Sequence, residues 1–137
     1  MILVDTCVLI DIAEDDEHWA EWSSRQIAAW SDRGPVIINP IVFAEWSAMF
    51  AHVADVDAAV ADHGLTWQDI PRPALFLAAQ AHTLYRRSGG AKAMVLPDFL
   101  IGAHAAIARM PVLTRDPERF THYFNGLQVI SPNRLNH

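Results

Sequence analysis

The sequence predicts an α/β fold, built on a parallel sheet with helices on both faces. The first observation is that short apolar runs of strand type alternate with longer helical stretches along the 137 residues. Such alternation is typical of parallel strands joined by helical crossovers. The second observation is that these runs are apolar throughout, as expected of strands that are buried on both faces.

Five short segments are predicted to be strands, because each is a β-rich apolar run beside turn residues or a helical pattern. The third of them is the weakest and is bounded by Pro71 and Pro73. The predicted strands are residues 1–4, 36–38, 65–70, 112–114 and 127–130.

Helices are predicted between these strands from apolar spacing and from stop signals such as Gly-Pro and Gly-Gly pairs. Thr6 is expected to cap a short helix that begins at Cys7. Pro97 stands in or just before the first turn of another helix, where proline is tolerated, and residues 91–96 before it are expected to form a loop. The remaining predicted helices are residues 18–32, 41–51, 55–62, 74–88, 98–109 and 117–123.

Length and composition indicate a single domain over residues 1–137, long enough to bury its own core. The sequence has no apolar stretch near the roughly 20 residues that cross a membrane and no basic segment before the first strand, so neither a membrane span nor a signal peptide is expected. The only cysteine, Cys7, has no internal disulfide partner, which favours a cytoplasmic location. A net charge of −6 argues against non-specific nucleic-acid binding unless cations offset the acids.

Four carboxylates stand at the ends of strands or near the starts of helices. Asp5 follows the first strand, Glu45 lies in the helix after the second, Asp98 follows Pro97, and Asp116 follows the fourth strand. The carboxyl ends of parallel strands meet at one edge of the sheet, where such folds bind ligands. Carboxylates gathered there repel one another. A shared site therefore predicts a hard cation, Mg²⁺ or Mn²⁺, and chemistry on a phosphate.

Each acid also has a simpler interpretation. Asp5 is placed to cap the helix that follows it, and Glu45 to lie on a solvated helix face. Asp98 favours a helix N-terminus through the helix dipole, and Asp116 suits a turn or an N-cap. The joint placement of the four acids is a stronger signal than any one of them.

The flanking residues of these acids resemble those of PIN domains, and most closely of VapC-type toxin ribonucleases from type II toxin–antitoxin systems. No single motif is specific, but their order and spacing together are, and the resemblance spans almost the whole chain. The matching stretches are ILVDTCVLI at 2–10, PIVFAE at 40–45, LPDFLIGAHA at 96–105, VLTRDPERF at 112–120 and LQVISP at 127–132.

The resemblance implies a three-layer α/β/α fold with a five-stranded parallel sheet. It also implies an endoribonuclease that depends on Mg²⁺ or Mn²⁺ and hydrolyses RNA phosphodiesters with a metal-activated water. By motif, the metal-binding and catalytic acids would be Asp5, Glu45, Asp98 and Asp116, the last being the least secure. Thr6 and Thr114 occupy the hydroxyl positions beside the first and last acids, and as further site residues they would hydrogen-bond carboxylates or water. The implied partners are RNA, a small cognate antitoxin and a second copy of the chain.

Three residues near these motifs have structural interpretations. Gly102, on the face of the Asp98 helix that also carries Ile101 and Ala105, would let another element approach closely. Cys7 has no paired base at readable spacing, so a packed side chain is favoured over a nucleophile. His104, among apolar neighbours, is expected to be a packed, hydrogen-bonded histidine rather than a ligand.

Aromatic and basic side chains are candidates for RNA and partner contacts. Trp19, Trp22 and Trp30 share a helical stripe that favours the core or a partner surface over base stacking. Phosphate contacts are expected from the arginines and from one lysine, with Arg115 preferred because it adjoins Asp116. The candidates are Arg86, Arg87, Lys92, Arg115 and Arg119.

Two other functions stay open from the residues alone. A phosphatase of the haloacid dehalogenase type also places an aspartate after its first strand, but it would need a second aspartate at position 7, which is Cys7 here. A non-catalytic PIN-like interaction module would be expected to lack one or more of the four acids, and all four are present.

Overall fold

The computed structural model describes residues 1–90 and 94–132 of the chain. Five short strands form the sheet, and all of them were predicted, although four are shorter than expected. They are β1 (Ile2–Val4), β2 (Val36–Ile38), β3 (Leu65–Trp67), β4 (Val112–Leu113) and β5 (Val129–Ile130).

The sheet is parallel throughout, with the strand order β3-β2-β1-β4-β5. The chain therefore builds outward from β1 to β3, then returns to the other side of β1 for β4 and β5. The order reverses between β1 and β4, which pair through Leu3 with Val112 and Val4 with Leu113. In open α/β sheets, this switch point at the carboxyl edge is the usual binding crevice.

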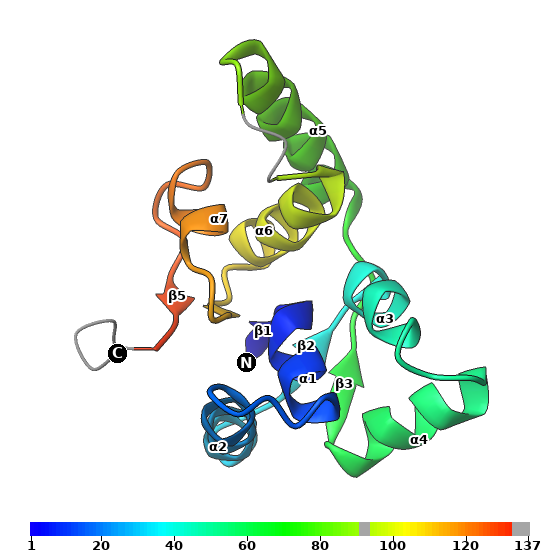
Figure 1. The fold of residues 1–137 in the computed structure, drawn as a ribbon. Helices are drawn as coiled ribbons and strands as arrows, with labels where there is room; N and C mark the ends of the chain where they lie inside the picture. The colour runs from blue at the N-terminus through cyan, green and yellow to red at the C-terminus, as the bar shows by residue number, and fades with distance from the viewer. Residues whose placement is uncertain (91–93, 133–137) are drawn as a thin grey trace.

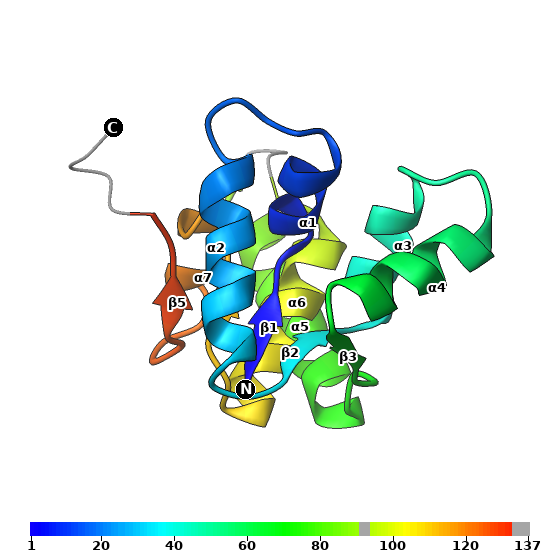
Figure 2. The ribbon, with the colours of Figure 1, turned by 90° about the horizontal axis from the view of Figure 1, so that it is seen from below.

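Helices cover both faces of the sheet and confirm the three-layer α/β/α architecture. In Figures 1 and 2, α1 and α2 lie on one side of the strands, and α5 and α6 lie on the other. The helices in the described residues are α1 (Thr6–Ala13), α2 (Ala20–Ser31), α3 (Pro40–Ser47), α4 (Val53–Asp62), α5 (Arg72–Arg87), α6 (Leu96–Ala108) and α7 (Glu118–Thr121).

Two local predictions were wrong. Thr6 does not cap α1; the Asp5 side chain does, accepting a hydrogen bond from the Thr6 backbone N–H at 2.8 Å. The helix expected over 41–51 ends at Ser47. Beyond it the chain turns, and Phe50 packs edge-on against the buried Trp46, with ring centroids 5.4 Å apart.

The core has a main cluster around the sheet and a smaller one between α5, α6 and the residues after α7. On α2, Ile27 belongs to the main cluster and Trp22 and Trp30 pack against it. Trp19 stands edge-on to Trp22. These contacts agree with the core interpretation of the tryptophan stripe. No helix in residues 1–90 and 94–132 is both long and apolar enough to cross a membrane.

Candidate active site

Asp5 lies at the centre of the polar residues beyond the carboxyl edge. Its backbone N–H donates to the Leu113 carbonyl at 2.9 Å, which extends the pairing of β1 with β4 by one residue. Its carboxylate is almost fully buried. One oxygen accepts from the Thr6 N–H, and the other accepts from the Thr114 hydroxyl at 2.8 Å and the Cys7 thiol at 3.4 Å. The side chain is therefore fixed in one orientation.

Burial raises the pKa of Asp5, because removing a carboxylate from water disfavours its charged form. The hydrogen bond from Thr114 and the positive charge of Arg119 oppose this effect. Burial also raises the pKa of the Cys7 thiol to about 12, with the Asp5 charge adding to the shift. A thiol held neutral is a poor nucleophile. This agrees with the prediction that Cys7 is a packed side chain.

Glu45 reaches this cluster from α3. Asn39, which follows β2, caps α3 by accepting hydrogen bonds from the backbone N–H groups of Ile41 and Val42. One turn further along, the exposed Glu45 accepts a hydrogen bond from the Thr6 hydroxyl at 2.7 Å. The hydroxyl expected to support a carboxylate does so, and it joins the first acid to the second.

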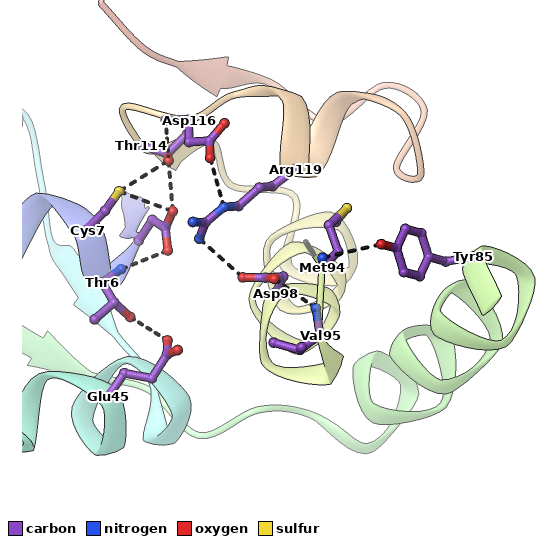
Figure 3. Close-up of polar contacts among 11 residues, drawn as sticks. Thr6, Cys7, Glu45, Tyr85, Met94, Val95, Asp98, Thr114, Asp116 and Arg119 are labelled. Atoms are coloured by element: carbon purple, nitrogen blue, oxygen red, sulfur yellow. Dashed lines mark hydrogen bonds and ion pairs between the residues drawn. The ribbon is translucent and has the colours of Figure 1, made fainter. Parts of the chain in front are cut away.

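Asp98 stands in the first turn of α6 and is buried. Its Oδ2 accepts a hydrogen bond from the Val95 N–H at 3.1 Å, so it also stabilises the start of the helix. The preceding residue is tied to α5, because the Met94 N–H donates to the Tyr85 hydroxyl at 3.3 Å. Oδ1 is turned toward Arg119, as Figure 3 shows.

Asp116 and Thr114 follow β4. The Thr114 hydroxyl, which donates to Asp5, accepts a hydrogen bond from the Asp116 N–H at 3.0 Å. Arg119 then connects two acids, since its Nε lies 3.0 Å from Asp116 Oδ2 and its Nη1 lies 3.3 Å from Asp98 Oδ1. Figure 3 shows the guanidinium between these carboxylates.

The structure thus brings all six predicted site residues together. Hydrogen bonds and ion pairs form one continuous chain from Glu45 to Asp98. The order along it is Glu45, Thr6, Asp5, Thr114, Asp116, Arg119 and Asp98.

The donor set fits a hard divalent cation, because carboxylate oxygens are the ligands that Mg²⁺ and Mn²⁺ prefer. Asp5, Glu45, Asp98 and Asp116 present four carboxylates within one hydrogen-bonded chain. Among the described residues, no three acidic, histidine or cysteine side chains already surround one point at metal-binding distance. The acids are instead linked through two threonines and Arg119, so a cation would have to draw them closer.

Two further features were not predicted from the sequence. The buried Asp11 of α1 pairs with Arg115 at 2.6 Å, so the arginine preferred for phosphate contact already has a carboxylate partner. Arg119 was named for phosphates but not for its pairing with two acids. Its spacing of three residues from Asp116, across the start of a short helix, was the available signal. Lys92 lies outside the described residues.

A sequence profile of the PIN domain matches residues 2–123, which is most of the chain. The chain belongs to the PIN-domain family. Nucleases of this family typically use divalent cations. Family membership excludes the haloacid dehalogenase alternative, in agreement with Cys7 at the position where those phosphatases need an aspartate. No curated protein matches the chain in sequence.

Solved structures share this PIN fold at low sequence identity. One chain of VapBC2 from Rickettsia felis, bound to a promoter DNA fragment, has a TM-score of 0.73 at 15% identity, over 97% of this chain and 100% of that one. A chain of VapBC-1 from nontypeable Haemophilus influenzae has a TM-score of 0.70 at 13% identity, over 96% and 98%. A chain of a toxin–antitoxin complex from Klebsiella pneumoniae has a TM-score of 0.56 at 21% identity, over 97% and 98%.

Proposed function

We propose that this PIN domain is a metal-dependent endoribonuclease and the toxin of a VapBC-type toxin–antitoxin pair. The observation that carries the proposal is the meeting of four carboxylates at the switch point of the sheet, two of them almost fully buried. Buried acids without a structural cation partner are costly. Arg119 alone does not balance four of them, so the site is suited to bind a further cation.

The metal would be held by Asp5, Glu45 and Asp98, with Asp116 completing or adjusting the site. A divalent ion bound there would lower the pKa of a water and stabilise the charge that develops on the scissile phosphate. Thr6 and Thr114 orient the carboxylates of Glu45 and Asp5 through their hydroxyl hydrogen bonds. Such hydrogen bonds limit the orientations that the two carboxylates can take before a metal binds.

The decisive experiment compares RNA cleavage by the wild-type protein, Asp5→Asn and Asp98→Asn in Mg²⁺ or Mn²⁺. We expect each variant to lose at least about 10- to 100-fold in rate, because even residues that only support metal ligands contribute that much. A chelator should stop the wild-type reaction. Asp57→Asn on the exposed face of α4 is the matched control, since it makes the same chemical change away from the site.

Wild-type rates in Asp5→Asn and Asp98→Asn would rule out this assignment of the site. RNA cleavage that continues in the presence of the chelator would rule out a requirement for a divalent cation. A protein that cleaves no RNA would favour the alternative of a non-catalytic PIN-like interaction module. The presence of all four acids in the sequence favours the endoribonuclease over the non-catalytic module.

The partner proposals follow from the fold neighbours, which are chains of VapBC and toxin–antitoxin complexes. A small antitoxin would cover the acidic site, and a second copy of the chain would complete a homodimer. Apolar side chains for such contacts are exposed on α5, among them Leu75, Phe76 and Leu84.

Induced expression in a bacterium should arrest growth and produce new RNA ends with the wild type but not with Asp5→Ala. Sedimentation of the purified chain as a monomer would refute the homodimer.

A further inference from the structure

Arg119 occupies one carboxylate oxygen on each of two of the four acids. Its guanidinium bonds to Oδ1 of Asp98 and Oδ2 of Asp116. The other oxygen of Asp98 is already engaged, because it accepts the N–H of Val95 at the start of α6. Oδ1 is therefore the Asp98 oxygen left to face a ligand, and Arg119 holds it.

The charges of the site explain why an arginine lies there. Asp5, Asp98 and Asp116 all act on Arg119: burial alone would lower its pKa, but the three carboxylates together raise it. The side chain of Arg119 is 35% exposed, whereas that of Asp98 is 9% exposed. The guanidinium can therefore swing toward water, while the carboxylate remains fixed to its helix.

A divalent cation and this guanidinium repel each other when both contact the same carboxylate, because both are positive, and they compete for the lone pairs of its oxygens. Binding of one must weaken binding of the other. By thermodynamic linkage, the cation weakens the binding of the guanidinium to the acids by the same free energy as the guanidinium weakens the binding of the cation.

We propose that Arg119 is the resident counter-ion of the acidic site, and that a divalent cation displaces it from Asp98 and Asp116 on binding. This inference rests on the proposed metal site. It assigns to Arg119 a positioning role: the guanidinium holds the two carboxylates in place without metal, and the free energy needed to release it lowers the affinity of the site for the metal. The arginine is thus a competitor of the cation rather than one of its supports.

The test is a Mn²⁺ titration of the purified full chain without RNA, read by calorimetry or by electron paramagnetic resonance of free Mn²⁺. Arg119→Gln should bind Mn²⁺ about fivefold or more tightly than the wild type, within the usual range of coupling between two ligands. Arg119→Lys should lie between them, because it keeps the charge but lacks the planar fork that bridges two carboxylates.

Arg25→Gln on α2 is the matched control. It removes the same charge from an exposed pair with Glu21, which touches none of the four acids, and should leave the Mn²⁺ affinity unchanged. Thermal unfolding of each apo variant checks that it folds; Arg119→Lys carries the test if Arg119→Gln does not.

The outcomes separate this inference from the proposed function. Unchanged or weaker Mn²⁺ binding in Arg119→Gln, with binding in the wild type that Asp98→Asn abolishes, would overturn the counter-ion role and leave the metal site standing. An equal gain in Arg25→Gln would also overturn it, because net charge would then explain the effect. No Mn²⁺ binding in any of the variants or the wild type would overturn both.

Discussion

At the scale of single residues, His104 links three elements through its buried ring. Its Nδ1 lies 3.1 Å from the Asn39 amide nitrogen, and its Nε2 lies 2.8 Å from the Gln68 Oε1. Asn39 Oδ1 is already used to cap α3, so its amide donates to Nδ1. The neutral ring with a proton on Nε2 satisfies both partners. This agrees with the prediction of a packed, hydrogen-bonded histidine.

Burial lowers the pKa of His104 from its ordinary value of 6.5. At pH values between the lowered pKa and 6.5, the unfolded chain therefore binds a proton at His104 more readily than the folded chain does. The stability that His104 contributes is present above this range and is lost as the pH falls through it. From about pH 7.5 to about pH 5.5, we expect the unfolding free energy of the wild type to fall more than that of His104→Gln. Denaturant unfolding at both pH values measures this. Equal losses would show that His104 is not the group responsible.

At the scale of elements, Gly102 determines how closely α6 meets the segment after α7. A Cβ at this position would lie 2.4 Å from Cε2 and 2.7 Å from Cδ2 of Phe124. Phe124 is buried and packs against Phe99, so its ring cannot move aside into solvent. The close approach predicted from the sequence is thus present, and it places the helix of Asp98 beside the segment that directly follows α7, the helix of Arg119.

Gly102→Ala should lower the unfolding free energy by about 1–3 kcal/mol, the usual cost of overpacking a core. The change also adds up to about 1 kcal/mol of helix propensity, so a net gain in stability would show that the contact is loose. The double variant Gly102→Ala with Phe124→Leu should recover part of the loss, because the smaller side chain makes room. Chemical denaturation of the wild type, Gly102→Ala and the double variant measures the three unfolding free energies.

At the scale of the whole molecule, the acidic site joins segments from both halves of the chain. Asp5 and Glu45 lie before β3, and Asp98 and Asp116 lie after it. A cation bound by these acids would bind the folded chain far better than the unfolded one, where the same carboxylates are dispersed. Ligands that prefer the folded state stabilise it by mass action.

Mn²⁺ at about 100 times its dissociation constant should therefore stabilise the wild type by about 2.7 kcal/mol. Asp98→Asn should show a much smaller gain at the same concentration, while the exposed Asp57→Asn should match the wild type. The melting temperature with and without a chelator is the measurement. An equal rise in all three proteins would indicate binding elsewhere on the surface.

The sequence by itself predicted the five strands, the helices on both faces of the sheet and the four acids near its edge, because these follow from apolar runs, turn residues and acids placed where strands end. Thr6 and Thr114 were predicted only through the resemblance to PIN domains, and the order of the strands in the sheet was not predicted. Only the tertiary structure decided that Asp11 pairs with Arg115, that His104 ties Asn39 to Gln68, and that Arg119 stands between Asp98 and Asp116. Most of these contacts join residues far apart in the chain. Their partners are chosen by packing and by the need to satisfy buried charge, which no local pattern records.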